Sequence, residues 1–449
     1  MCEHRRVTVT SPLPPGPKLP PPLQTAALTA RPVEYVERNR ERFGGTFTAR
    51  LAQVGTIVFF SDPQTIKEVF SSDRDNSITQ GRNVVLEPIL GTKSLLVQEG
   101  DEHLSRRRLM LPPFHGDRMR AYEDEIERAT LSEISGWQVG DVIQSHPAMQ
   151  RITLEVIMSA VFGVSDSRHE ALRASLSSVL ATTRSPVAFG LTFPMLRRFP
   201  PYRGMLRQLA ATDRLLVEEI TERRADPSLD EREDILSMLV AARDEDGNGL
   251  TDQELRDQLM TLLLAGHETT ATALAWCFDL LLRDPEALDR LRTEIDESGG
   301  GDWMEAVIDE TLRVRPVVPM IGREIGNEME LDGWSLPPGT SVMLSIYLAH
   351  TRPDVFENPY AFDPSRFLGE KPDTYSWIPF GGGTRRCVGA AFAEFEMRVV
   401  LRTILSSLDL APGSDRPDQM IRRNVTLSPK HGSPVRVVER RRAEADSAA

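Results

Sequence analysis

The sequence predicts a mainly α-helical protein with small β-sheets, and two observations support this fold class. Apolar residues recur at helical spacing over most of the chain, in segments 64–70, 117–137, 149–162, 204–224, 233–243, 252–283, 286–297, 302–314 and 388–408. Strand signals are few by comparison: an alternating stretch about Gly55 (46–60), a run after a Pro-Pro-Gly turn (334–346), and two late segments. We expect these late segments, 424–429 and 434–439, to pair as a hairpin about His431-Gly432.

Composition excludes several classes of protein. The 449 residues include 53 Lys or Arg and 66 Asp or Glu, a formal net charge of −13, which argues against nucleic acid as the main partner. The three cysteines, Cys2, Cys277 and Cys387, form no C-x-x-C pair, so neither a disulfide framework nor a structural zinc site is expected. No apolar stretch suits a signal peptide or a membrane span. We therefore expect a cytoplasmic protein with no membrane span.

The organisation of the chain points to one large domain. Residues 1–24 are rich in proline and should lie extended over the surface, and residues 439–449 resemble a disordered tail. No linker, repeat or low-complexity segment interrupts residues 25–438, which we expect to form a single catalytic domain.

One predicted helix, 252–283, has residues at its centre that conflict with its expected buried position. Thr251 and Glu254 form a capping box at its start, and Asp284-Pro285 ends it. A helix of this length spans roughly 48 Å and should lie in a core. Its middle nevertheless reads AGHETT (265–270), in which glycine and threonine weaken a helix. Such local conflicts concentrate at functional sites.

The strongest chemical signal surrounds Cys387. Three glycines (381–383) precede it and would let the backbone approach a neighbour closely, while a helix after it would favour the thiolate. A thiolate there is either a nucleophile or a metal ligand, and no histidine base lies in the segment. Phe380 could shield the sulfur of a ligand cysteine, and Gly389 could leave room beneath a flat cofactor. A buried structural cysteine in a glycine-rich turn is the plainer alternative.

This segment, F-G-G-G-T-R-R-C-V-G (380–389), resembles the haem-binding loop of the cytochrome P450 monooxygenases, F-x-x-G-x-x-x-C-x-G, at every fixed position. Four further motifs of that family lie earlier in the chain, in the expected order, and the resemblance spans roughly 13–438. They are HLSRR (103–107), AGHETT (265–270), the E-x-x-R element of Glu310 and Arg313, and FDPSRF (362–367), which contains Arg366.

The resemblance implies a haem-thiolate monooxygenase with the helical prism fold of that family and a long central helix over haem b. Cys387 would be the axial iron ligand, and Thr269 and Glu268 would be the acid–alcohol pair that delivers protons to bound dioxygen. A hydroxyl that only bonds back to the carbonyl of Ala265 is the alternative for Thr269. Ala265 would pass close over the haem plane, and Gly266 would leave space there.

The resemblance also assigns supporting residues. Four cations would contact the haem propionates: His103, Arg107, Arg323 and Arg385. For His103 and Arg323 a surface position is the alternative. Glu310, Arg313 and Arg366 would form a desolvated structural network on the cysteine side of the haem. The other histidines, His146 and His350 among them, receive no role.

A lipophilic substrate (fatty acid, terpenoid, steroid or polyketide) would occupy an apolar pocket. Its lining would include Val85, Leu86, Phe189, Phe193, Ala265, Gly266, Val317, Val318 and Leu427. One oxygen atom of O2 would be inserted, with electrons from a separate ferredoxin or flavodoxin and its reductase, and ultimately from NAD(P)H. The basic run Arg106–Arg108, with Arg118 and Arg120, could dock that acidic partner. Two other functions stay open: a peroxide-driven peroxygenase, and a haem-binding sensor or carrier without turnover.

Overall fold

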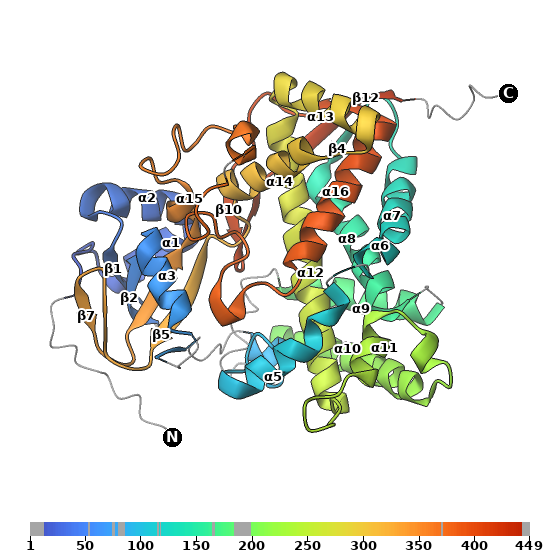
Figure 1. The fold of residues 1–449 in the computed structure, drawn as a ribbon, viewed down its shortest axis with the longest axis horizontal. Helices are drawn as coiled ribbons and strands as arrows, with labels where there is room; N and C mark the ends of the chain where they lie inside the picture. The colour runs from blue at the N-terminus through green and yellow to red at the C-terminus, as the bar shows by residue number, and fades with distance from the viewer. Residues whose placement is uncertain are drawn as a thin grey trace. The chain divides into compact units, whose positions relative to one another are not determined.

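The structure of the chain is a computed structural model that describes residues 13–52, 54–73, 77–79, 86–114, 116, 118–163, 167–183, 199–369 and 371–441 (Figure 1). The chain divides into two compact units. Unit 1 takes residues 1–81, 309–387 and 420–428, and unit 2 takes residues 82–308, 388–419 and 429–449. The single catalytic domain expected over 25–438 stays a prediction beside this division.

The fold class is confirmed as mainly α. Unit 1 contains helices α1 (Pro21–Ala30), α2 (Pro32–Phe43), α3 (Pro63–Ser71) and α15 (Ile346–His350), and α14 (Asp302–Val314) crosses the boundary between the units. Unit 2 contains α4 (Glu87–Leu90), α5 (Gly100–Met110), α6 (Arg118–Ala121), α7 (Glu123–Ser135), α8 (Ser145–Phe162), α9 (Ser167–Thr183), α10 (Pro200–Ala225), α11 (Ile235–Ala241), α12 (Asp252–Leu281), α13 (Pro285–Ser298) and α16 (Ala390–Ser407). Every helix predicted from apolar spacing is present, the segment 117–137 as the pair α6 and α7.

The main sheet belongs to unit 1 and has the strand order β1-β2-β8-β5-β3. Its strands are β1 (Phe47–Leu51), β2 (Gly55–Phe60), β8 (Ser341–Ser345), β5 (Met320–Ile325) and β3 (Ile78–Thr79). β1 and β2 form the antiparallel hairpin predicted about Gly55, whose φ of 96° favours glycine at the turn. β2 pairs with β8 in parallel, and the apolar side chains of one face pack with Phe70 of α3 in a common core.

The predicted late hairpin is wrong in its pairing. The strands exist as β11 (Thr426–Pro429) and β12 (Pro434–Arg440), but β11 pairs with β10 (Met420–Arg423), with Asn424 at a φ of 55° beside the turn. β12 instead lies between β4 (Val142–Gln144) and β9 (Leu408–Pro412). The remaining small sheet pairs β6 (Met329–Leu331) with β7 (Trp334–Leu336). The misassignment arose because a nearby turn signal outweighed partners that are distant in sequence.

The described part of each terminal segment includes regular structure: helix α1 starts within 1–24, and strand β12 reaches Arg440. The proline-rich segment runs beside β1, where the amide of Thr48 donates to the carbonyl of Pro15 at 3.0 Å. Helix α1 begins at Pro21, because proline at the first helical position lacks only an N–H that would have no helical partner there. At the other end β12 extends to Arg440, whose guanidinium donates to the carbonyl of Trp137 at 2.6 Å. Residues 1–12 and 442–449 lie outside the described residues.

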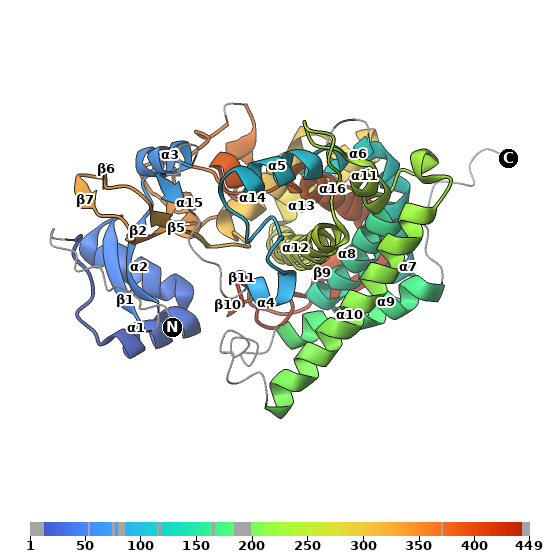
Figure 2. The same cartoon turned by 90° about the horizontal axis from the view of Figure 1, so that it is seen from below.

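Within unit 2, α12 runs among the other helices, and Figure 2 views it nearly end-on. The capping box of Thr251 and Glu254 forms as predicted, and α8, α10 and α16 pack against the helix. Over most of its length α12 is buried, as expected of a core helix. No helix in the described part of the chain is both long enough and apolar enough to cross a membrane.

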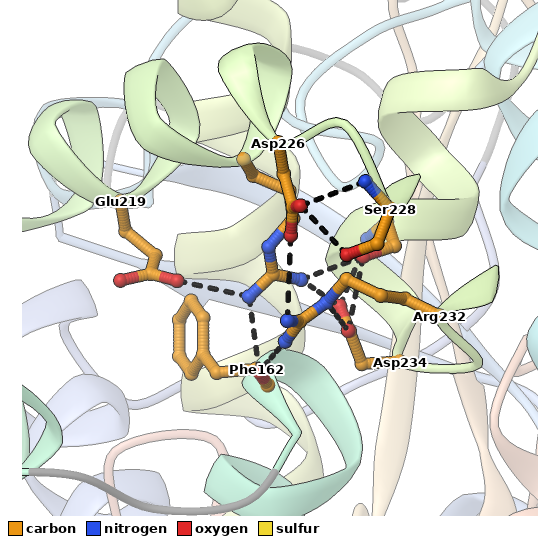
Figure 3. A network of polar contacts seen from close by, with 8 residues as sticks. Phe162, Glu219, Asp226, Ser228, Arg232 and Asp234 are labelled. Atoms are coloured by element: carbon orange, nitrogen blue, oxygen red, sulfur yellow. Dashed lines mark hydrogen bonds and ion pairs between the residues drawn. The ribbon is translucent and has the colours of Figure 1, made fainter. Parts of the chain in front are cut away.

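A buried charge network also organises unit 2 (Figure 3). We call it the Arg223 network; it contains Glu219, Arg223, Arg232 and Asp234. The guanidinium of Arg223, 4% exposed, pairs with Asp234 and with Glu219, and both arginines donate to the carbonyl of Phe162. Since Phe162 ends α8 and the carboxylate of Asp234 caps α11, the network joins the ends of three helices, α8, α10 and α11.

Candidate active site

Cys387 ends a tight loop in unit 1. Its amide donates to the carbonyl of Phe380 at 2.9 Å, and the amide of Gly381 donates to the carbonyl of Ile378 at 3.0 Å. Cys387 is exposed, and α16 begins three residues later at Ala390. The prediction of a cysteine presented just before a helix is confirmed.

The glycines of this loop have a steric reason. Gly381 and Gly383 have φ values of 68° and 65°, which disfavour other residues. A Cβ on Gly382 would lie 2.5 Å from the ring of Phe70, and one on Gly383 would overlap Asp73. The backbone therefore packs directly on the C-terminal end of α3, which fixes the path of the loop toward Cys387.

The predicted structural network, here called the Glu310 network, forms in unit 1. The guanidinium of Arg313 makes two hydrogen bonds to the carboxylate of Glu310, at 2.6 and 2.7 Å, and Arg366 lies 3.5 Å from the same carboxylate. Glu310 and Arg313 are both 0% exposed, so the network is desolvated as expected. Three carbonyl oxygens also accept from Arg313, those of His350, Pro359 and Ala361, at 2.8, 2.7 and 3.0 Å.

His350 joins this network to the cysteine loop. Its carbonyl accepts from Arg313, and its ring Nε2 accepts from the amide of Ile378 at 2.8 Å. Burial lowers the pKa of His350 to about 3, so the ring is neutral and can accept that bond at ordinary pH. Sequence reasoning missed this residue because its partners lie 37 and 28 positions away.

The centre of α12 departs from the burial of the rest of the helix. Ala265 is exposed, and Leu262, Gly266 and Thr269 are partly exposed, while flanking turns are buried. These four positions follow helical spacing and so share one face. The polar centre predicted to be functional therefore includes a row of solvent-accessible residues, the accessible stripe, in an otherwise buried helix.

Thr269 and Glu268 differ in their surroundings. The hydroxyl of Thr269 donates to the carbonyl of Ala265 at 2.6 Å, which is the back-bond named as its alternative role. The carboxylate of Glu268 accepts from Gln150 at 2.7 Å and lies 3.5 Å from Nε2 of His146. Glu268 is therefore held from α8 within unit 2.

The predicted propionate contacts are placed as follows. His103 and Arg107 lie one turn apart on α5; His103 is 3% exposed, which removes its surface alternative. Arg385 is half-buried in the 3-10 turn Gly383–Arg385, two residues before Cys387. Arg323 is 5% exposed, so the surface alternative is wrong for it as well. Its Nε lies 3.1 Å from the carboxylate of Asp73, and its guanidinium stacks on Phe70.

The predicted pocket residues are only partly described. Val85, Phe189 and Phe193 lie outside the described residues, and Leu86 is half-buried beside α4. Leu427 and Val317 come together in unit 1, where the amide of Leu427 donates to the carbonyl of Val317 at 2.8 Å. Leu427 is completely buried, which makes it a core residue of that unit, whereas Val318 is partly exposed. The exposed apolar residue of this hairpin is Val425, at 56%.

Comparison with known proteins identifies the family. The profile of the cytochrome P450 family matches residues 13–435. The chain belongs to the cytochrome P450 family. Among relatives, cytochrome P450 135B1 of Mycobacterium tuberculosis is 38% identical over 442 residues, covering 97% of this chain and 94% of the relative. Cytochrome P450 138 of the same species is 37% identical, with 97% and 99% covered.

Solved cytochromes P450 share the fold. The haem domain of cytochrome P450DA superposes with a TM-score of 0.84 at 25% identity, covering 96% of this chain and 98% of that one. The retinoic acid-bound cyanobacterial CYP120A1 gives the same TM-score at 24% identity, with 96% and 100% covered. The family profile and these relatives indicate that the chain is a cytochrome P450 monooxygenase. Members of this family use haem, a redox partner and an organic substrate.

The residues around Cys387 fit a haem. The donor set is one exposed sulfur in a loop held by its own backbone, which suits a soft axial ligand. A Cβ on Gly389 would meet nothing within 4 Å, so open space lies where room for a flat group was expected. The cationic side chain of Arg385 lies in the same loop.

Proposed function

We propose that this cytochrome P450 is a haem-thiolate monooxygenase that inserts one oxygen atom of O2 into a lipophilic organic substrate, with haem b bound by Cys387. The observation that carries the proposal is the exposed cysteine at the end of a loop fixed by glycine packing and a backbone hydrogen bond. The Glu310 network supports that loop through His350.

When bound, the haem supplies the oxidising chemistry, and electron donation from the cysteine sulfur favours O–O cleavage. The chain supplies the rest. Cys387 would hold the group as a thiolate, and His103, Arg107 and Arg385 would pair with its propionates. Arg323 joins them less directly, because its guanidinium is already paired with Asp73. With the haem bound, Phe380 would shield the sulfur from water.

Thr269 and Glu268 provide protons. The hydroxyl of Thr269 holds a water at the accessible stripe of α12 after it leaves its bond to the carbonyl of Ala265. The carboxyl group of Glu268 accepts and returns a proton from solvent. Ala265 and Gly266 leave space on the same face of the helix.

The substrate is of the fatty acid, terpenoid, steroid or polyketide class. The support is the apolar character of the residues expected near the reacting group, among them Val85, Phe189, Phe193 and Val318. A library screen for displacement of the iron-bound water, followed in the haem absorption spectrum, would identify the class. If no lipophilic compound shifts the spectrum, a sensor or carrier without turnover gains support.

The ligation is tested with the two described cysteines as a matched pair. Protein purified from haem-replete cells should be coloured, and its reduced carbon monoxide complex should show the band of a thiolate-ligated haem. Cys387→Ala should lose that band or the haem itself. Cys277→Ala, at a completely buried position of α12, should keep both. A native band typical of imidazole ligation would contradict the proposal.

Proton delivery is tested at Thr269. Thr269→Ala should still bind haem but release hydrogen peroxide in place of product, while Thr269→Ser should keep the coupling because it keeps the hydroxyl. Full coupling in Thr269→Ala would exclude this residue from the proton path. Turnover with peroxide alone, and none with a redox pair, would favour the peroxygenase alternative.

A ferredoxin or flavodoxin with its NAD(P)H-dependent reductase would supply the electrons. Arg108 is the exposed member of the basic run, at 68%, and its pair with Glu245 is exposed as well, whereas Arg106 is only 20% exposed and pairs with Glu254. Arg108→Glu should therefore slow reduction by an acidic ferredoxin, and salt should slow the native protein. Arg436→Glu, an exposed position on β12, is the control. Rates insensitive to salt and to Arg108→Glu would exclude this docking surface.

A further inference from the structure

One face of α8 contacts the functional centre of α12. Its residues His146, Gln150, Thr153 and Ile157 fall at positions i, i+4, i+7 and i+11, which share a helix face. The side chain of Thr153 donates to the carbonyl of His267 at 2.9 Å, and Ile157 would lie 3.3 Å from a Cβ on Gly266. This face of α8 therefore packs along the segment of α12 whose residues have low helix propensity.

Two residues of this face meet the carboxylate of Glu268. Nε2 of Gln150 donates to Oε2 at 2.7 Å, and Nε2 of His146 lies 3.5 Å from Oε1. Each carboxylate oxygen thus faces a separate side chain, and the two side chains are one helical turn apart. The hydroxyl of Thr272 lies 3.1 Å from the same His146 nitrogen and orients the ring.

Burial makes this arrangement specific. His146 is 1% exposed, Thr272 is 0% exposed, and the side chain of Glu268 is 17% exposed. A carboxylate in such surroundings is stabilised by each donor that faces it, and a lost donor is not replaced by bulk water. The side chain of Glu268 therefore depends on α8 for its orientation.

The helix that carries His146 is itself anchored at both ends. At its start the amide of His146 donates to the carbonyl of Gly432 at 3.0 Å, and the hydroxyl of Ser145 donates to the carbonyl of Ser433 at 2.7 Å. At its end the Arg223 network holds the carbonyl of Phe162 (Figure 3). The imidazole is consequently carried by a helix that contacts within unit 2 hold at both ends.

We propose that His146 is a positioning residue for the reaction: with Gln150 it holds the carboxyl group of Glu268 in the orientation from which that group passes protons to Thr269. This rests on the proposed function, which gives Glu268 its role as the acid. His146 itself touches neither cofactor nor substrate. The donor role toward Glu268 requires the ring proton on Nε2, which lies 3.5 Å from Oε1 of Glu268 and 3.1 Å from the Thr272 hydroxyl.

The test is a double-mutant cycle between His146 and Glu268 on the haem-loaded, full-length protein. Hydrogen peroxide released per NADPH oxidised is measured with a plant-type ferredoxin and its reductase as electron donors, both without an organic compound and with dodecanoic acid as a lipophilic probe. The variants are His146→Phe, His146→Gln, Glu268→Gln and the double variant His146→Phe with Glu268→Gln. Haem content and the carbon monoxide band report that each variant is folded.

We expect His146→Phe to raise the peroxide yield and to slow NADPH oxidation about tenfold, the lower end of the effect seen when a partner that orients a metal ligand is lost. His146→Gln keeps an N–H donor and should restore most of the native behaviour. The double variant should be no worse than Glu268→Gln alone, because both changes disable one group. Ile157→Val alters packing on the same face without touching Glu268 and should leave the yield unchanged.

The outcomes separate the two proposals. If Glu268→Gln alters the yield but His146→Phe does not, or if their effects add, the positioning role is overturned and the proposed function stands. If Glu268→Gln itself changes nothing, Glu268 is not the acid, and the positioning role fails with it. An effect of Ile157→Val equal to that of His146→Phe would assign both to general packing and would also overturn the inference.

Discussion

The Glu310 network of unit 1 and the Arg223 network of unit 2 use the same chemistry to different ends. In each, a buried arginine binds both carboxylate and backbone carbonyl oxygens, with Arg313 at 0% and Arg223 at 4% exposure. Arg313 binds one carboxylate and three carbonyls, and Arg223 binds two carboxylates and one carbonyl. Arg313 holds carbonyls of the segment 350–361, and through His350 it reaches the cysteine loop. Arg223 holds the end of α8, the helix that contacts Glu268.

The comparison indicates that the role of a buried ion pair depends on which segment of the chain it holds in place. Removing one partner from either pair leaves an uncompensated charge, so both should be costly to break. Only the Glu310 network, however, connects within its unit to the loop that presents Cys387. Substitutions in the two networks test this distinction, and a buried carboxyl group and an exposed ion pair outside them show how burial sets the cost.

The largest effect is expected from Arg313→Ala. The change removes two hydrogen bonds from the buried carboxylate of Glu310, which keeps Arg366 at 3.5 Å and the amide of Asp363 at 2.9 Å, and it leaves three carbonyls without this donor. It should lower the free energy of unfolding by about 3–5 kcal/mol. Because His350 loses its anchor, the variant should also lose haem or the thiolate band. Thermal unfolding and the carbon monoxide spectrum measure the two effects. A destabilised protein with a native band would disconnect the network from the loop.

Arg223→Ala should come next, at about 3 kcal/mol, because Asp234 and Glu219 lose their common partner while Arg232 still pairs with Asp234. Its haem spectrum should remain native, since the fastened segment is α8. Hydrogen exchange should increase at the end of α8 and the start of α11. Loss of the thiolate band in this variant would remove the proposed contrast.

A third prediction concerns pH and Glu396 of α16. Burial raises the pKa of Glu396 to about 8, against an ordinary value near 4.5, although Thr270 donates a hydrogen bond to it. Between pH 4.5 and 8 the folded protein therefore keeps a proton on Glu396 that the unfolded chain has already released. The free energy of unfolding should fall as the pH rises through that window. Glu396→Gln should flatten this dependence in urea unfolding at about pH 5 to 8. Equal slopes would show that Glu396 ionises freely.

The smallest effect is expected at an exposed ion pair. Arg398 and Glu305 lie 2.9 Å apart, with 39% and 49% of their side chains exposed. Arg398→Ala should change the free energy of unfolding by roughly 0.2–1 kcal/mol, because solvent screens the pair. Measured in the same unfolding series, it calibrates the two buried networks. A loss as large as that of Arg313→Ala would mean that burial does not set the cost.

Sequence reasoning recovered the features that depend on local spacing. The capping box at Thr251 and the cysteine loop each lie within a few residues of chain, so their patterns are visible directly. It misjudged features that depend on distant partners. The strand 434–440 pairs with residues 142–144 and 408–412, and no local signal names either partner.

The histidines show the same limit at the candidate site. Neither His146 nor His350 has a possible metal-ligand partner at a suitable spacing in the sequence, so sequence reasoning gave them no role. In the structure each is buried within hydrogen-bonding reach of a segment that carries a predicted functional residue: α12 for His146, and the cysteine loop for His350. A histidine becomes informative only when its surroundings are known, because burial and neighbours set its protonation and its partners.

The Glu310 network was expected only from the resemblance to the cytochrome P450 family. By itself, then, the sequence determined the helical class, the loop that presents Cys387 and the polar centre of α12. These are encoded by periodicity and by residue types at fixed short spacing. The tertiary structure alone decided which strands pair, why the loop needs its glycines, that Arg323 is held by Asp73, and that α8 grips Glu268. These depend on surfaces that meet only after the chain has folded, and their energies come from burial and desolvation, which the order of residues does not show.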